Sequence, residues 1–264
     1  MVLSVKVKDI ASAIEDFAPR RWQESYDNAG LQVGNPDMEV SAVLVCLDVT
    51  ERILQEAIER GCNMIVSHHP LIFKGLKELT GHTAVERIAI EAIRGDIAIY
   101  SAHTNLDSAW DGVSHEVAHI LGLCNLVTLD VKQGETRVGI GVVGDLDPVP
   151  KMEFLRRLKE DFAVKGLRYA AAWPGLVVKR VAVCGGAGAY LIPAAIKAGA
   201  DAIVTGDVKY HDYTTYGEDI LISDIGHYES EFCTRQILSR LIKDRFPECP
   251  VFGAETEENP IQIL

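Results

Sequence analysis

Short runs of consecutive apolar residues alternate along this chain with segments of helical periodicity. Val43–Cys46 and Met64–Val66 are two such runs, and the segment between them has apolar residues at helical spacing and ends at Gly61. A continuous apolar run of this length is typical of a strand that is covered on both faces, as in parallel sheets. The pattern therefore predicts a β-α-β unit within an α/β fold.

The same unit occurs a second time at a constant spacing. Residues 43–67 align with residues 181–205 without a gap, at an offset of 181 − 43 = 138. Identical pairs at this offset are Val43 with Val181, Val45 with Val183, Cys46 with Cys184, Ala57 with Ala195, Ile58 with Ile196, Gly61 with Gly199, Ile65 with Ile203 and Val66 with Val204. Chance similarity between two β-α-β units is the alternative to a duplication, because such units resemble one another.

The repeat predicts two pseudo-symmetric, interlinked α/β lobes with mostly parallel sheets flanked by helices. The polar, glycine-containing segment 125–136 is the predicted boundary, which gives an N-terminal lobe over residues 1–125 and a C-terminal lobe over residues 126–264. Segment 24–34 is typical of a turn that enters a strand. Helices are predicted at 8–17, 114–122, 151–163 and 229–246.

Composition and charge narrow the classes of function. Lys and Arg total 26 against 38 for Asp and Glu, and the resulting net charge of −12 makes nucleic acid an unlikely partner. No apolar run approaches the roughly 18 residues of a membrane span, and the first residues lack a basic region followed by an apolar run, so we expect a cytoplasmic protein without a membrane partner. The 6 cysteines are dispersed without a C-x-x-C pair, and we interpret them as reduced core residues.

Two adjacent histidines, His68 and His69, follow the strand that ends near Val66. Neighbouring side chains on a regular strand point to opposite faces, so both rings can serve one site only where the strand has ended and the chain turns. Pro70 is consistent with such a turn. This pattern indicates a candidate ligand pair at the carboxyl end of a strand.

Each half of the chain also carries a histidine followed four residues later by an acid. These pairs are His103 with Asp107 and His227 with Glu231, at a constant offset of 227 − 103 = 231 − 107 = 124. Both follow predicted strands, at the edge where open α/β sheets place their ligand crevices. Any one histidine alone is more simply a packed or solvated group, but together the six residues offer four imidazoles and two carboxylates. That set suits two divalent ions per subunit, such as zinc, iron or manganese, with open positions for water.

The constellation resembles the Nif-three-like dinuclear-metal hexameric family, whose bacterial members are often named GTP cyclohydrolase 1 type 2 homologues. The resemblance spans essentially the whole chain and rests on Trp22, Asp27, Asn28, Gly30, Leu31, Gly34, Ser67–Pro70, His103–Asp107, Gly206, Asp207, Gly226, His227 and Glu231. It implies two linked lobes, a two-metal site between them held by the six candidate ligands, and assembly to a homohexamer. The length fits the short form without an inserted domain. Ser114 and His115 replace a common Asn-Asp pair, and Asp207 replaces a common Glu.

A pair of cations in one crevice favours hydrolysis, because one ion lowers the pKa of a bound water and the other polarises the bond under attack. We therefore expect a dinuclear-metal-dependent hydrolase that acts on a small anionic or nucleotide substrate. The resemblance implies GTP cyclohydrolase-like ring opening with formate release. His211 is the candidate catalytic proton donor. The alternative, from another class, is a metal-binding ring-forming scaffold or regulatory protein without turnover.

Three further patterns each have two interpretations. The glycine-containing segment from Cys184 to Tyr190 is either a tight strand-to-helix turn or a phosphate-contacting loop. Lys74 and Lys77 either meet an anionic substrate or point into solvent. His115 and His119 are spaced like two ligands on one helix face, but no acid completes the pair, and a packed or solvated helix face is the favoured interpretation.

Overall fold

The computed structural model describes residues 4–170 and 173–264, and the chain forms two compact units. Unit 1 comprises Met1–Leu106 together with Thr234–Asn259, and unit 2 comprises Asp107–Cys233 together with Pro260–Leu264. This division differs from the predicted continuous lobes 1–125 and 126–264. The reason is that a helix and a strand from the C-terminal part of the chain complete the first unit rather than the second.

Unit 1 is built on a sheet whose inner strands are parallel. In the order of the sheet, the strands are β1 (Gly30–Val33), β4 (Ala98–Ser101), β3 (Met64–Ser67), β2 (Val43–Cys46) and β11 (Val251–Gly253). Only β1 runs antiparallel to its neighbour, and the late strand β11 pairs in parallel with β2. The predicted parallel sheet is confirmed here.

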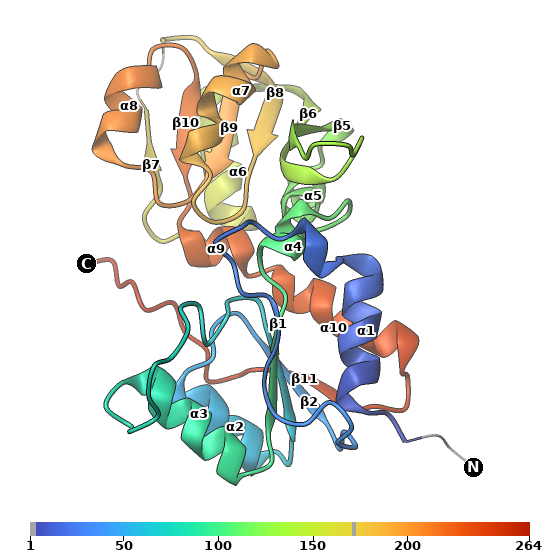
Figure 1. The fold of residues 1–264 in the computed structure, drawn as a ribbon. Coiled ribbons are helices and arrows are strands. Elements are labelled where there is room, and N and C mark those ends of the chain that lie inside the picture. The colour runs from blue at the N-terminus through green and yellow to red at the C-terminus, as the bar shows by residue number, and fades with distance from the viewer. Residues whose placement is uncertain (1–3, 171–172) are drawn as a thin grey trace. The chain divides into compact units, whose positions relative to one another are not determined.

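Helices cover both faces of this sheet, as Figure 1 shows. The helices of unit 1 are α1 (Val7–Phe17), α2 (Glu51–Glu59), α3 (Ala84–Arg94) and α10 (Thr234–Arg245), with a short turn η1 (Arg20–Trp22) after α1. Apolar residues of α2 and α3 share one core with the sheet, while α1 and α10 pack together on the opposite face. The hydroxyls of Thr50 and Thr83 cap α2 and α3 by accepting a backbone N–H of the first turn.

Unit 2 has a mixed sheet rather than a mostly parallel one. Its strands are, in order, β5 (Cys124–Val131), β6 (Gly139–Pro150), β8 (Val177–Val183), β9 (Ala202–Thr205), β10 (Leu221–Asp224) and β7 (Arg168–Tyr169). The three strands β8, β9 and β10 are parallel, whereas β5, β6 and β7 join antiparallel. The segment 125–136, predicted as the boundary between lobes, instead contains most of β5 and the turn that leads into β6.

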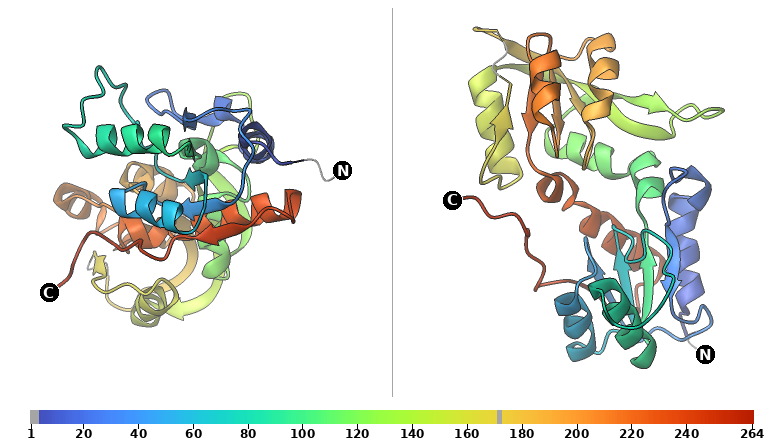
Figure 2. Two further views of the ribbon diagram at one scale, coloured as in Figure 1. Left: turned by 90° about the horizontal axis from the view of Figure 1, so that it is seen from below. Right: turned by 60° about the vertical axis from the view of Figure 1, so that its left-hand side comes forward.

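Helices also flank the sheet of unit 2. They are α5 (Val113–Ile120), α6 (Lys151–Asp161), α7 (Ile192–Lys197), α8 (Tyr210–Tyr216) and α9 (His227–Glu231), with a turn η2 (Ala189–Leu191) before α7, while α4 (Thr104–Ser108) contains the point where the units divide. Apolar residues of α7 and α8 share one core cluster with the sheet. In the second view of Figure 2, α7 and α8 lie on one side of the strands of this unit and α6 on the other. The predicted helix 229–246 is two helices, α9 and α10, and the turn between them, at Phe232 and Cys233, lies where the units divide.

The two copies of the predicted repeat fold alike. Val43 lies opposite Met64 between β2 and β3, and Val181 lies opposite Ala202 between β8 and β9, so both pairings keep the offset of 138. The next strands, β4 and β10, correspond at 221 − 98 = 123. The offset of 124 between the two histidine pairs therefore includes one extra residue after β10, in the turn that contains Gly226, where φ is 94°. Among residues 4–170 and 173–264, every helix is too short or too polar to cross a membrane.

Candidate functional site

Unit 1 brings together the three histidines that follow β3 and β4. His68 and His69 come directly after Ser67, the last residue of β3, and His103 comes two residues after the end of β4. Because β3 and β4 are parallel neighbours, their carboxyl ends meet at the same edge of the sheet. Each ring offers a nitrogen atom that lies within 4.8 Å of the other two. The sequence prediction that these histidines share a site is therefore consistent with the geometry.

The Nδ1 atom of each of these rings bonds to an oxygen that can only accept. His68 Nδ1 donates to the carbonyl of Ala102 at 2.8 Å. His69 Nδ1 bonds to Asp48 Oδ1 at 2.8 Å, and His103 Nδ1 bonds to Asp27 Oδ1 at 2.7 Å. A neutral imidazole with its proton on Nδ1 carries its lone pair on Nε2, which is then the atom available to a cation. An oxygen behind a ligating histidine is the usual arrangement at metal sites, since it fixes the ring and raises its basicity.

Asp27 is the most constrained of these supporting oxygens. Its side chain is 0% exposed, and its second oxygen accepts from the backbone N–H and the hydroxyl of Thr104. Burial acts to raise the pKa of Asp27, but the hydrogen bonds from His103, Thr104 and Asn28 outweigh it and lower the pKa to about 2. Asp27 is therefore a carboxylate at every physiological pH, and it ties His103 to the start of α4.

Asp48 supports His69 from a half-exposed position and is itself held through the backbone. Glu257 Oε1 accepts from the N–H groups of Leu47 and Asp48 at 2.7 and 2.9 Å. Our sequence analysis missed both acids. The position of Asp48 just after the strand 43–46 could have indicated a role at this edge of the sheet. Nothing in the sequence links Glu257 to Leu47, which is 210 positions away.

Unit 2 brings together the other predicted donors, Asp107, His227 and Glu231. His227 and Glu231 are one turn apart on α9, and His227 Nε2 lies 3.0 Å from Glu231 Oε2. A carboxylate oxygen of Asp107 lies within 4.8 Å of one of Glu231. His227 Nδ1 bonds to Asp207 Oδ2 at 2.7 Å. Asp207 therefore orients the His227 ring, as Asp27 and Asp48 orient the rings of His103 and His69 in unit 1.

Glycines let the backbone pass close to these donors. Gly186 has φ 61°, and a Cβ atom there would lie 2.2 Å from Glu231 Oε1. A Cβ on Gly206 would lie 2.7 Å from the backbone nitrogen of His227. Only glycine fits at these two positions without moving a candidate ligand.

The turn around Gly186 is a structural turn rather than a phosphate-contacting loop. The N–H of Gly186 donates to Ser230 Oγ at 2.9 Å, and the N–H of Gly188 donates to Thr205 Oγ1 at 2.8 Å. Both donors are used inside the protein, and the helix α7 that follows has only 6 residues. Of the two interpretations of the segment from Cys184 to Tyr190, the tight turn is therefore the one that the geometry favours.

The donor set fits a divalent transition metal held by nitrogen and oxygen. The candidate ligand atoms are imidazole nitrogens and carboxylate oxygens, which suit zinc, iron or manganese. Cys184 is also near, and burial and then the charges of Asp107 and Glu231 raise the pKa of its thiol. Cys184 is in none of the groups of clustered donor atoms found among the described residues, so we do not include sulfur in the set.

The other predicted residues lie elsewhere. His211 is exposed on α8 beside Tyr210, and it is in none of the groups of clustered donor atoms found among the described residues. Lys74 and Lys77 are exposed. His115 is buried against Trp110, and burial lowers its pKa to about 4, which supports a packed helix face. The cysteines are all free, and of them only Cys124 is exposed.

Known proteins match this chain over nearly its whole length. The sequence pattern of a family described as Duf34/NIF3 (NGG1p interacting factor 3) matches residues 5–260. A Clostridium acetobutylicum protein named GTP cyclohydrolase 1 type 2 homolog is 38% identical over 244 residues, covering 91% of each chain. A Clostridium perfringens protein of the same name is 38% identical, covering 98% of this chain and all of its own. A crystal structure of a Staphylococcus aureus protein superimposes with a TM-score of 0.92 at 28% identity, covering 99% of this chain and 100% of that chain.

Proposed function

Since the chain belongs to the Duf34/NIF3 family, we propose that it is a metal-dependent hydrolase with two divalent ions per subunit. We assign the ligands to three histidines of unit 1 and to two acids and a histidine of unit 2: His68, His69, His103, Asp107, His227 and Glu231. The observation that carries the proposal is the common orientation of the four rings, each with its Nδ1 atom held by an oxygen. Packed or solvated histidines have no reason to share this orientation.

Bound divalent ions lower the pKa of a coordinated water and polarise the bond that is attacked. The chain's own residues prepare the place for that chemistry. Asp27, Asp48 and Asp207 accept from the Nδ1 atoms, so that Nε2 is the ligand atom of each neutral ring. The Glu231 carboxylate is 3% exposed, so when an ion is bound it adds a negative charge that water screens little.

The names of the relatives suggest the concrete reaction. We propose that the substrate is a small anionic molecule, with a purine nucleotide as the first candidate, and that water opens its imidazole ring and releases formate. The exposed side chains of Lys74 and Lys77 follow the His68–His69 turn and are available to an anionic group. We also propose assembly into a homohexamer, which light scattering of the purified protein tests.

The decisive experiment measures metal content and turnover on the same samples. Protein purified without chelators should contain two equivalents of a divalent metal and release formate from GTP or another nucleotide. Two variants, His69→Ala in unit 1 and Glu231→Gln in unit 2, should each lose metal and activity. His119→Ala, which changes an exposed histidine of α5, is the matched control and should retain both.

The pair of variants also tests whether the donors form one centre. If His69→Ala and Glu231→Gln each abolish turnover, both donor sets serve one reaction. If each variant loses one ion and turnover is unaffected by either, the sets are separate structural sites and the proposal is wrong. Full metal content and normal assembly without turnover on a panel of nucleotides would favour the scaffold or regulatory alternative.

The role of His211 as proton donor stays a prediction. His211→Ala should lower kcat, and the pH profile of kcat should lose its basic limb, while the metal content stays at the wild-type level. Unchanged kcat in this variant would remove His211 from the mechanism.

A further inference from the structure

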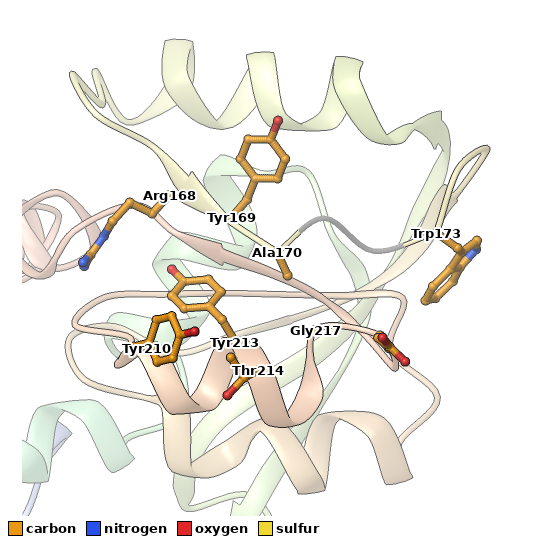
Figure 3. Close-up of a pocket in the computed structure, with 9 residues that line it drawn as sticks. Arg168, Tyr169, Ala170, Trp173, Tyr210, Tyr213, Thr214 and Gly217 are labelled. Carbon is orange, nitrogen blue, oxygen red and sulfur yellow. The ribbon is translucent and has the colours of Figure 1, made fainter.

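A groove of about 920 Å³ opens on unit 2 between α8 and β7. Its lining includes aromatic rings from separate parts of the chain, Tyr210 and Tyr213 on α8, Tyr169 on β7, and Trp173. Figure 3 shows Arg168 at one end of the groove and Trp173 at the other, with the rings of Tyr210 and Tyr213 between them. The volume is within the range of about 300 to 1,000 Å³ that is usual for sites of small organic ligands.

The rings of this groove are unusually open to solvent. Tyr210 is 75% exposed, Tyr169 is 44% exposed and Trp173 is 42% exposed. Scattered apolar side chains on a surface need no explanation, but several large rings that line one concavity mark a binding site. Flat rings with polar edges suit a flat ligand, because an aromatic face stacks on any heterocyclic base with little dependence on its identity.

The charges of the groove limit what such a ligand carries. Among the described residues that line it, Arg168 is the only cation, and its guanidinium is paired with the buried carboxylate of Asp224. Glu218 adds a negative charge to the same lining. A triphosphate binds where several cations or free backbone N–H groups gather, and this lining offers neither. Hydrogen-bonding groups are present instead, in the hydroxyls of Tyr210 and Thr214 and the carboxylate of Glu218.

Asp224 also keeps Arg168 in place. Its Oδ2 atom accepts from the N–H of Val208 at 3.1 Å, and its Oδ1 atom accepts from the N–H of Gly226 at 3.0 Å. Asp224 is 1% exposed, so the carboxylate that holds Arg168 is fixed by the surrounding backbone. Figure 3 shows the Arg168 side chain directed away from the rings of Tyr210 and Tyr213, so its charge is engaged by Asp224 rather than by a ligand stacked on those rings.

We propose that this groove binds the base of a nucleoside, which stacks on Tyr210 and forms a hydrogen bond with the hydroxyl of Thr214, one turn away on α8. Recognition is of the planar heterocycle and not of a polyphosphate. The site is built from residues outside the candidate metal ligands, and binding does not depend on hydrolase activity.

The test uses the full chain after treatment with EDTA, so that metal and turnover play no part. Guanosine and adenosine are titrated while tryptophan fluorescence is followed, with excitation at the red edge of the tryptophan absorption, and calorimetry gives the affinity independently. Both nucleosides should quench fluorescence saturably, and GTP should bind no more tightly than guanosine. Tyr210→Ala should weaken affinity about five-fold or more, the size expected for loss of one stacking ring.

Two further variants test whether binding depends on Tyr210 specifically. Trp173→Phe should keep calorimetric affinity within about two-fold, because Trp173 lies at the other end of the groove from Arg168 and apart from Tyr210 (Figure 3). Tyr190→Ala removes a tyrosine of unit 2 that is 59% exposed and does not line the groove, and it should bind like the wild type.

Several results would overturn the proposal. These are absence of saturable binding of either nucleoside, equal affinity of Tyr210→Ala and the wild type, and GTP affinity ten-fold above that of guanosine. If sedimentation shows instead that Tyr210→Ala changes the oligomeric state and not nucleoside binding, the groove is an interface between copies of the chain. A failure of hydrolysis leaves all of these measurements intact, so the two proposals stand or fall separately.

Discussion

Asp27 offers the clearest test of how the histidines are prepared for metal. Asp27→Asn keeps the size of the side chain but replaces one oxygen with an NH2 group. Both oxygens of Asp27 accept hydrogen bonds, one from His103 and Asn28 and the other from Thr104. In the variant, one of these donors must face another donor, or His103 must move its proton to Nε2 and lose the ligand atom.

The expected loss follows from burial. Removing an acceptor behind a ligating histidine costs about 10- to 100-fold in metal affinity, which is about 1.4 to 2.7 kcal/mol. The side chain of Asp27 is 0% exposed, so water cannot replace the lost acceptor, and we expect the upper part of that range. The side chain of Asp48, which supports His69 in the same way, is 50% exposed. Water can take over part of its role, so Asp48→Asn should lie at the lower end.

The assay is competition for zinc against a chromogenic chelator at neutral pH, with a thermal melt of the metal-free protein as the check on folding. Asp37→Asn serves as the control, since Asp37 is an exposed acid of unit 1 that pairs with Lys8. The reasoning fails if Asp27→Asn binds zinc within two-fold of the wild type. It also fails if Asp48→Asn loses more affinity than Asp27→Asn.

Three other variants test separate features. Glu56 is buried, and although burial acts to raise its pKa, hydrogen bonds from Glu255, Thr256 and Arg60 lower the pKa from 4.5 to about 2. A carboxyl group with a lowered pKa stabilises the fold at a pH above its unfolded value, and this stabilisation is lost as the pH falls toward 2. Glu56→Gln should therefore reduce the free energy of unfolding by about 3 kcal/mol at pH 7, and urea unfolding of the variant should depend less on pH between about pH 5 and 2. Gly186→Ala should reduce metal content because its Cβ meets Glu231, whereas Gly175→Ala, with φ 79° and open space around it, should suffer backbone strain alone and keep its metal. Phe154→Ala should lower the free energy of unfolding by about 3 to 5 kcal/mol, because Phe154 is 1% exposed. Met152→Ala is the control and should change the free energy of unfolding little, because Met152 is 48% exposed.

The sequence predicts the repeated strands well because their signal is local. Apolar runs such as Val43–Cys46 need no partner to be recognised, and the repeat then transfers the pairing register from one unit to the other. Short strands have no such signal. Val251–Gly253 is a strand only because it lies beside a run some 200 residues earlier, and Arg168–Tyr169 is too short for any alternation to show.

The error over the helix 229–246 has a tertiary cause. Phe232 and Cys233 are not helix breakers, and the periodicity continues through them. The interruption coincides with the division between the two compact units, so it reflects tertiary contacts on either side. Local propensity does not contain that information.

The candidate donors were predictable for a topological reason. Parallel strands end at one edge of a sheet, so histidines that follow successive strands in the sequence meet in space, as His68 and His103 do. The groups that support them were harder to predict, because no pattern in the sequence pairs an acid with a particular histidine. Asp27 reaches His103 across 76 residues, and only the family resemblance drew attention to it.

The interleaved course of the chain has a consequence for its synthesis. Residues 107–233, which make up most of unit 2, leave the ribosome as a continuous stretch before Thr234–Asn259 has been made. Until then the nascent N-terminal unit lacks the helix that covers one face of its sheet and the strand that protects the edge of β2. Such an uncovered edge invites pairing with other chains. Chaperones that bind nascent chains at the ribosome should therefore raise the yield of folded protein, and slower translation after codon 233 should lower that yield.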